Sequence, residues 1–364
     1  MKDSGSQSPV GRMRTPASLG YRMPAEWEPH AASWLAWPHN HTDWPGKFQP
    51  IPWVYAEIVR NLAEVETVHL IVQNPVEERQ ARRVLGKAGA DLERIAFHRW
   101  PTNRVWTRDY GPIFVKRSDH KTDPVAAVNF VFNAWAKYPD WKLDNQIPAR
   151  VAKLLGIPRF DASIDGRPFV LEGGSIDVNG RGTLLTTEEC LLSETQQRNP
   201  GASRARIEQA LHDYLGARHV IWLPRGIAGD DTHGHIDDIA RFTSPGTVAA
   251  AVERNRHDPN HDPLANNLKQ LHSTRDQDGR QLTVIELPMP RPLVFAGQRL
   301  PASYADFYIA NRCVLVPVFN DPHDRVALDV VAEAFPEHSV VPIYCGDLIW
   351  GLGAIHCMTQ QQPE

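Results

Sequence analysis

The chain contains little cysteine: Cys190, Cys313, Cys345 and Cys357 are the four among 364 residues. None forms a C-x-x-C pair, and four cysteines are too few for a disulfide framework in a chain of this length. We therefore expect free thiols and a cytoplasmic location. The first three thiols are interpreted as structural, with no His or basic partner apparent for Cys190 or Cys345. Cys357 follows His356 in a glycine-interrupted segment and is a candidate nucleophile.

Long apolar runs and an excess of positive charge are also missing. No stretch approaches the roughly 18–20 apolar residues that cross a bilayer, and the polar residues 1–22 contain no apolar signal core. The formal net charge of −4 argues against nucleic-acid binding, because phosphate contacts need concentrated Lys and Arg. We expect no membrane or nucleic-acid partner, a disordered tail over residues 1–22, and a single domain over residues 23–364.

The chain does contain alternating β-like and helical segments, which predict an α/β fold without a clear interdomain linker. Strands are expected at 68–73, 112–115, 125–131, 183–186, 219–223, 248–252, 283–287 and 313–319. Helices are expected at 53–62, 76–87, 145–155, 204–215, 264–272 and 324–334.

Four polar residues recur at nearly regular intervals along these segments. Asp109, Glu172, His235 and Asp306 are separated by 63, 63 and 71 residues, and each precedes a strand, a turn and a second strand. Such spacing indicates stacked supersecondary units that each present one polar residue to a shared axis, although four points can reach it by chance.

The densest polar cluster is Gly229–Asp238, GDDTHGHIDD. If residues 234–239 are extended, His235 and Asp237 point to the same side and could perform acid–base chemistry beside a bound cation. The alternatives are a metal site formed by His233, His235 and Asp237, or a solvated acidic loop.

Two further motifs carry a carboxylate. In WTRDYGP, Asp109 lies three residues after Trp106, and a carboxylate with an indole suits a guanidinium or ammonium ligand. In LEGGS, Glu172 precedes two glycines and could orient a histidine through a charge-assisted hydrogen bond. Each motif can also be an ordinary turn.

Taken together, these motifs resemble one family. MPAEWEPHAASWLAWP, WTRDYGP, NFVFNAW, LEGGS, GHIDD, FYIANRCVLVPVFNDPHD and IHCMTQQQP occur in that order from about Met23 to Pro363. They are closely similar to agmatine deiminases and bacterial-type (Porphyromonas-type) peptidylarginine deiminases, in the guanidine-modifying, or pentein, superfamily. The resemblance implies a five-module ββαβ-type α/β propeller with pseudo-fivefold symmetry, which would explain the regular spacing.

The resemblance also implies roles for individual residues. Cys357 matches the nucleophile and His235 the general acid/base. Asp109 and Asp237 match the carboxylates that grip the substrate guanidinium, and Glu172 matches the acid that hydrogen-bonds the catalytic histidine.

Two more matches concern the substrate pocket. Trp106 matches an indole that lines it, and Asp231 falls where agmatine deiminases carry an acid near the distal amine. The implied reaction is hydrolysis of agmatine to N-carbamoylputrescine and ammonia, a step of putrescine biosynthesis, through a covalent cysteine thiouronium. No metal or cofactor is expected, and the expected partner is a small guanidinium substrate, with a homodimer left open.

Departures from the family pattern leave alternatives open. The chain has Gly351-Leu352-Gly353-Ala354 where Gly-Gly-Gly-Asn is common, and Ala136-Lys137 where the family tends to have a glycine pair. Free or peptidyl arginine, or another guanidino compound, is therefore an alternative substrate. A metal-dependent hydrolase and a non-catalytic binding module are the alternatives from other classes.

Overall fold

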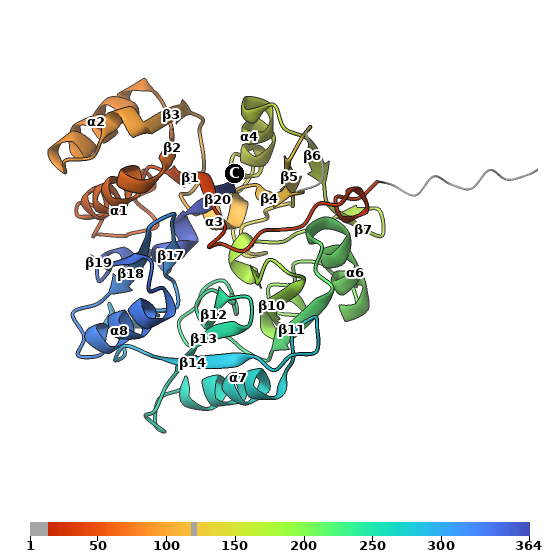
Figure 1. Cartoon of the computed structure of the whole chain (residues 1–364). Helices are drawn as coiled ribbons and strands as arrows, with labels where there is room; N and C mark the ends of the chain where they lie inside the picture. Colours follow the sequence, from red (N-terminus) through yellow and green to blue (C-terminus); the bar gives the residue numbers. More distant parts are fainter. Residues whose placement is uncertain (1–13, 118–121) are drawn as a thin grey trace, which may run out of the picture.

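The computed structural model describes residues 14–117 and 122–364. Within these residues, five sheets of three or four strands share one plan (Figure 1). Their strand orders are β20-β1-β2-β3, β4-β5-β6, β9-β10-β11, β12-β13-β14 and β17-β18-β19. In each sheet the first pair is antiparallel and the second pair is parallel. Parallel neighbours require a crossover, which helices α1, α2, α4, α6, α7 and α8 supply.

The strands are β1 (His30–Ala36), β2 (Thr67–Val72), β3 (Ile95–Arg99), β4 (Ile113–Lys116), β5 (Val125–Asn129), β6 (Arg159–Asp161), β7 (Ser163–Ile164), β8 (Arg167–Pro168), β9 (Asp177–Val178), β10 (Thr183–Thr187), β11 (His219–Leu223), β12 (Ala240–Ser244), β13 (Thr247–Val252), β14 (Thr283–Pro288), β15 (Val294–Phe295), β16 (Gln298–Arg299), β17 (Tyr308–Ile309), β18 (Cys313–Val318), β19 (Ser339–Tyr344) and β20 (Gln360–Pro363). The α-helices are α1 (Ile51–Val65), α2 (Pro75–Lys87), α3 (Thr107–Tyr110), α4 (Ile147–Leu155), α5 (Glu188–Leu191), α6 (Arg204–Leu215), α7 (His261–Ser273) and α8 (Asp324–Ala334). The 3-10 helices are η1 (Ala17–Leu19), η2 (Leu92–Arg94), η3 (Asp144–Gln146), η4 (Gly173–Ser175), η5 (Leu348–Gly351) and η6 (His356–Met358).

Local sequence explains where several helices begin and end. The side chain of Asn74 caps α2 by accepting hydrogen bonds from the amides of Val76 and Glu77, and Pro75 occupies the first helical turn, where a missing N–H costs nothing. Helices α4 and α6 end at Gly156 and Gly216, which take the left-handed conformation that favours glycine. These signals set the crossover lengths and so bring each parallel strand back beside its partner.

The last strand completes the first sheet. β20 pairs antiparallel with β1, with Trp34 opposite Gln360 and Ser33 opposite Gln361. Figure 1 shows the five sheets arranged around a common centre, with helices α1, α4, α6, α7 and α8 towards the periphery. Segments from the two ends of the described chain therefore close the arrangement by main-chain hydrogen bonds.

The regularly spaced polar residues occupy equivalent places in the five units. Each lies just before the first strand of its sheet: Asp109 before β4, Glu172 before β9, His235 before β12, Asp306 before β17, and Cys357 before β20. The spacing in the sequence therefore reflects a real structural repeat, and Cys357 is its fifth member.

Most expected elements are present. Helices α6 and α8 and strand β11 have the predicted bounds, and the mixed α/β prediction is confirmed. The predicted strands correspond to β2, β4, β5, β10, β11, β13, β14 and β18, and the other described strands were not predicted, among them β1, β3, β12, β19 and β20. Among the described helices, none is long and apolar enough to cross a membrane.

The predicted disordered tail needs a correction. Residues 1–13 lie outside the described part of the chain. Of the rest, Ala17–Leu19 forms η1, Tyr21 is buried in an apolar core, and Arg22 pairs with Lys116 in an isolated bridge. The ordered structure therefore begins before Met23, because Tyr21 packs against the second and third units.

Candidate active site

The site is a cavity of about 240 Å³ at the converging ends of the units. Its walls combine aromatic rings, carboxylates and one thiol. The lining residues are Thr42, Asp43, Arg104, Trp106, Asp109, Trp135, Tyr138, Asp231, Thr232, Gly351, Leu352, Gly353 and Cys357. The cavity has the concave, mixed polar and apolar lining of a small-molecule site, and its volume suits a small ligand.

Asp109 is the buried carboxylate on the cavity wall. It lies on α3, and its Oδ2 accepts a hydrogen bond of 2.9 Å from the indole nitrogen of Trp135. The amide of Gly174 donates to its Oδ1 at 3.3 Å. Burial raises the pKa of Asp109 to about 7, with His235 acting in the opposite direction. A cation that enters the cavity therefore finds a desolvated carboxylate held in one orientation.

His235 is fully buried beside this carboxylate. Its Nδ1 lies 3.8 Å from Asp109 Oδ1 and 3.9 Å from Asp237 Oδ1. Neither ring nitrogen has a hydrogen-bond partner among the described residues. Burial acts to lower the pKa of His235, but Asp109, Cys190 and Glu172 raise it well above the usual value. The imidazole is therefore expected to be protonated at neutral pH.

The loop that carries His235 and Asp237 is not extended, so the condition under which alternation would place both side chains on one side is not met. Residues 237–239 form a turn, in which the amides of Ile239 and Ala240 donate to the carbonyl of Ile236. The turn still brings the two side chains together, because the following residue, Ala240, begins β12 and fixes the loop at the edge of the sheet.

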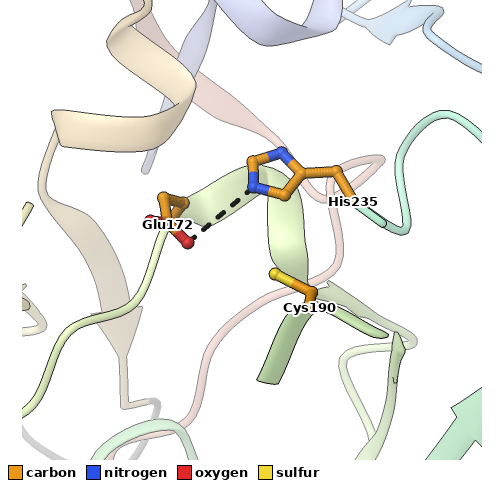
Figure 2. Close-up of side chains that lie close together, drawn as sticks. All are labelled: Glu172, Cys190 and His235. Atoms are coloured by element: carbon orange, nitrogen blue, oxygen red, sulfur yellow. Dashed lines mark ion pairs between the residues drawn. The ribbon is translucent and has the colours of Figure 1, made fainter. Parts of the chain in front are cut away.

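On the other side of the imidazole lies Glu172 (Figure 2). Oε2 of Glu172 is 3.8 Å from His235 Nε2. Nε of Arg198 donates to Oε1 of Glu172 at 3.1 Å and to Oε2 at 3.3 Å. Burial alone would raise the pKa of Glu172, but Arg198 and His235 lower it to about 2. The ionised carboxylate therefore favours the charged form of His235 and fixes the direction of the ring.

Cys190 was interpreted as lacking a histidine partner, and this is wrong. The thiol projects from α5 towards the imidazole of His235, as Figure 2 shows. Donor atoms of Cys190, Glu172 and His235 all lie within 4.8 Å of one another. The contact was not apparent from the sequence because 45 residues separate Cys190 from His235.

Gly174 permits the crowding of these groups. A Cβ at this position would lie 2.6 Å from His235 Nδ1, 2.8 Å from Asp237 Oδ2 and 2.9 Å from Asp109 Oδ1. Such distances are shorter than van der Waals contact, so only glycine lets the polar groups of three units converge here. This is a physical reason for the second glycine of the LEGGS motif.

Cys357 lies on η6 at the floor of the cavity and is buried. Its amide donates to Asp306 Oδ1 at 3.2 Å, and the amide of Ala354 donates to Asp306 Oδ2 at 2.7 Å. Its Sγ lies 4.0 Å from Asp237 Oδ2. Burial, then Asp306 and Asp237, raise the pKa of the Cys357 thiol well above its usual value. Without a cation in the cavity, Cys357 is therefore expected to be a protonated thiol.

Asp237 is held from below by a buried polar network. Its Oδ2 lies 2.8 Å from Nδ1 of His356, whose Nε2 lies 2.9 Å from Glu26 Oε2. Glu26 also pairs with Arg108 and Arg241 at 3.2 and 3.0 Å. Burial acts to raise the pKa of Asp237, but the hydrogen bond from His356 lowers it below the usual value. Oδ1 of Asp237 has no hydrogen-bond partner among the described residues and lies 3.9 Å from Nδ1 of His235.

The segment before Cys357 forms another wall. A Cβ at Gly353 would lie 2.8 Å from the indole of Trp106 and 3.1 Å from Cys357 Cβ. Leu352, where the family commonly has glycine, has a φ of 69°. A leucine in this left-handed conformation is strained, and such strain is found mainly where the surrounding structure is constrained for function.

Asp231 lies at the more exposed end of the cavity, with a fifth of its side chain exposed (20%). The hydroxyl of Tyr138 donates to its Oδ2 at 2.8 Å, and Lys137 forms an ion pair with its Oδ1. The predicted site residues thus divide between a buried end, with Asp109 and Cys357, and an exposed end, with Asp231.

The alternative metal site of His233, His235 and Asp237 is not formed. Nε2 of His233 instead lies 3.2 Å from the hydroxyl of Ser193. Among the described residues, the groups of three donors close enough to hold one ion are Glu172–Cys190–His235 and Asp237–Asp306–Cys357. His233 belongs to neither group.

Sequence reasoning missed residues that support the site from a distance in the chain. They are Glu26, Trp135, Cys190, Arg198 and His356. His356 carried a usable signal, because it adjoins the candidate nucleophile. Glu26 and Trp135 lie in the motifs MPAEWEPHAASWLAWP and NFVFNAW, whereas Cys190 and Arg198 lie in no motif named above, and only the folded chain brings all four to the site.

A thiol and several carboxylates from separate units thus line one cavity, and the buried imidazole of His235 lies directly behind Asp109. The fold and the site define an α/β enzyme whose pocket suits a cationic substrate. Residues 22–363 match the family described as Porphyromonas-type peptidyl-arginine deiminase, and the chain belongs to this family.

Individual relatives agree with this assignment. Agmatine deiminase of Pseudomonas aeruginosa (strain LESB58) is 36% identical, over 96% of this chain and 97% of the relative. The structure of agmatine deiminase of Enterococcus faecalis is similar with a TM-score of 0.87 and 32% identity, over 99% of this chain and 100% of that chain. A cysteine-to-serine variant of C. jejuni agmatine deiminase with substrate bound has a TM-score of 0.83 and 29% identity, over 94% of this chain and 96% of that chain.

Proposed function

We propose that the protein is an agmatine deiminase, which hydrolyses the guanidinium of agmatine to N-carbamoylputrescine and ammonia. The observation that carries the proposal is that Asp109 and Cys357 line the buried end of one cavity, with His235 and Asp237 within 4.0 Å of them. The names of the relatives supply the substrate. We further propose that residues 23–364, together with the segment Ala17–Arg22 that packs on them, act as a single catalytic domain in the cytoplasm, built as a five-module pentein propeller with pseudo-fivefold symmetry.

Guanidinium binding follows from charge and geometry. Asp109 and Asp237 are the carboxylates that grip the cation, since Oδ1 of Asp237 has no other partner among the described residues and Asp109 faces the cavity. Two carboxylates on a planar guanidinium fix the orientation of its central carbon towards Cys357. Trp106 forms the apolar wall beside it.

The bound cation also prepares the nucleophile. Burial and several carboxylates raise the pKa of the Cys357 thiol, and Asp237 and Asp109 are two of these carboxylates. The bound guanidinium offsets the charges of these two and so lowers the pKa of the thiol, which ionises and passes its proton to solvent. The thiolate attacks the central carbon and forms a C–S bond. His235, charged in the free protein, protonates one nitrogen of the tetrahedral adduct, and ammonia leaves.

The second half of the reaction uses the same groups in reverse. Loss of ammonia leaves a thiouronium on Cys357 and a neutral His235. His235 then takes a proton from water as the water attacks the thiouronium carbon. Collapse of this neutral adduct breaks the C–S bond, and the proton of its hydroxyl group passes to the departing sulfur. This restores the Cys357 thiol and releases the neutral ureido product. Glu172, fixed by Arg198, stabilises the imidazolium at both stages.

A substrate panel tests the proposal. Purified protein is incubated with agmatine, arginine and an arginyl peptide, and the ureido product is measured, with Cys357→Ala as the inactive control. Turnover of agmatine above the other two supports the proposal, and turnover of arginine or the peptide alone would reject it.

A second experiment tests the assignment of the nucleophile. His235→Ala should slow hydrolysis and accumulate an adduct on Cys357, detectable by intact-mass and peptide mass spectrometry. An adduct on another cysteine would disprove the site. Turnover that persists in a chelator but is lost in Cys357→Ala would separate this mechanism from a metal-dependent one.

A further inference from the structure

Lys137 pairs with Asp231, the carboxylate at the exposed end of the cavity. Its ammonium forms an ion pair with Asp231 Oδ1, and 39% of the lysine side chain is exposed. The same ammonium lies 5.4 Å from the centre of the Tyr138 ring. A primary ammonium of the protein itself therefore sits where a cationic substrate tail would bind.

The turn that carries Lys137 joins both ends of the cavity. Ala134, Trp135 and Ala136 have φ values of 52°, 57° and 53°, a left-handed run that residues with side chains rarely adopt. The turn is held by Asn133, whose side-chain oxygen accepts a hydrogen bond of 2.8 Å from the amide of Ala136. It points Trp135 to Asp109 at the buried end and Lys137 to Asp231 at the exposed end.

Asp231 does not depend on Lys137 for its position. Tyr138 donates to its Oδ2 at 2.8 Å, and Gln196 Nε2 donates to its carbonyl oxygen at 3.1 Å. Gln196 also donates to the carbonyl oxygen of Trp135 at 3.1 Å, which ties the two loops together. The carboxylate therefore stays in place when the lysine moves away.

We propose that Lys137 is a specificity-determining residue that acts as a displaceable internal competitor for the substrate tail at Asp231. This inference rests on the proposed guanidine hydrolysis and extends it to the choice of substrate. A tail that ends in an ammonium exchanges with the ammonium of Lys137, while the guanidinium end binds at Asp109.

The exchange limits what a cationic tail contributes to binding. One ammonium replaces another at the same carboxylate, and the released lysine becomes hydrated, so most of the favourable contact is cancelled. With Lys137 in place, Asp231 is neutralised, and a neutral or anionic tail meets no unpaired negative charge. Lys137 thereby reduces the difference in kcat/KM between guanidines that carry cationic, neutral and anionic tails.

The test compares guanidines that differ only in the tail. They are agmatine with a cationic tail, butylguanidine with a neutral tail, and 4-guanidinobutyrate with an anionic tail. The variant is Lys137→Met, which keeps the alkyl stem beside Tyr138 and removes the charge. The matched control is Lys142→Met, which removes the same charge from an exposed residue five positions away.

In Lys137→Met, the kcat/KM ratio of agmatine to butylguanidine should rise roughly two- to fivefold, the size expected for a partly exposed ion pair. The value for 4-guanidinobutyrate should fall, because Asp231 is then unpaired. Lys142→Met should leave the kcat/KM ratio of agmatine to butylguanidine and the kcat/KM value for 4-guanidinobutyrate unchanged. An unchanged or reduced agmatine ratio in Lys137→Met overturns the inference, even while turnover of butylguanidine upholds the guanidine chemistry.

A binding measurement separates the two proposals completely. If the unaltered protein turns over none of the three guanidines, the proposed function fails, and calorimetric binding of butane-1,4-diamine then tests Lys137 alone. Tighter diamine binding in Lys137→Met than in the unaltered protein supports the exchange. Equal binding in the two proteins rejects it.

Discussion

The imidazole of His356 connects Asp237 to Glu26, with distances of 2.8 Å from Nδ1 to Asp237 Oδ2 and 2.9 Å from Nε2 to Glu26 Oε2. A neutral imidazole donates only one hydrogen bond, so two short contacts to carboxylates require either an imidazolium or a proton on one carboxyl group. The residue next to Cys357 thus determines the charge and direction of a carboxylate at the guanidinium site.

Replacing His356 should therefore change the pH dependence of the reaction. His356→Gln removes a hydrogen bond that lowers the pKa of Asp237, so this carboxylate should become protonated at a higher pH. The acidic limb of the kcat/KM profile should move to higher pH and become steeper. An unshifted profile with reduced activity at every pH would assign His356 a purely structural part.

Asp109 should dominate the acidic limb in the unaltered protein. Its pKa is raised to about 7 by burial, so it is protonated below that pH and loses attraction for a guanidinium, which stays charged throughout. We expect kcat/KM to increase with pH through about 7. The acidic limb of the kcat profile should fall at a lower pH than that of kcat/KM, because the bound cation favours the ionised form of Asp109.

Asp109→Asn provides the control for this assignment. It should reduce kcat/KM by about 100-fold through loss of guanidinium positioning, and the titration near pH 7 should disappear. Persistence of that titration in the variant would assign it to another group.

Gly174→Ala should abolish most of the activity. The new methyl group would lie within 2.9 Å of polar atoms of His235, Asp237 and Asp109, which must then move. Since misplacement by about 1 Å can cost roughly 100-fold in rate, we expect a loss of this order in kcat. Gly246→Ala, where a Cβ meets nothing within 4 Å, is the matched control. Equal activity of the two variants would contradict the close packing of His235, Asp237 and Asp109 around Gly174.

Glu26→Ala should lower the free energy of unfolding by about 3–5 kcal/mol, because it leaves the buried Arg108 and Arg241 without a shared carboxylate. Urea denaturation measures this change. Glu286→Ala, which breaks an exposed pair with Arg254, should cost less than about 1 kcal/mol. Similar decreases in the free energy of unfolding in both variants would show that the buried network stabilises the fold no more than an exposed ion pair.

The sequence predicted the elements whose own pattern is strong. Helices α6 and α8 follow the helical period from end to end, and β11 is a short β-rich run. β20 has the polar sequence QQQP, and only its pairing with β1 makes it a strand. Local pattern contains no information about that partner, which lies more than 320 residues away.

The same limit applies to the candidate site. The structure brings Asp109, Glu172, His235, Asp237 and Cys357 together, and their catalytic roles stay predictions. The interactions that tune them come from distant segments. Their partners could not be deduced from spacing, because each contact depends on how whole units pack.

Closure of the first sheet by β20 couples ligand binding to the integrity of the whole fold. Cys357 precedes the strand that pairs with β1, whereas Asp109 belongs to the neighbouring unit, so a ligand held by both spans the seam. By linkage, such a ligand stabilises the closed form by RT ln(1 + [L]/Kd). Fraying of this seam should inactivate the enzyme before its helices melt, and a bound guanidine should delay both events.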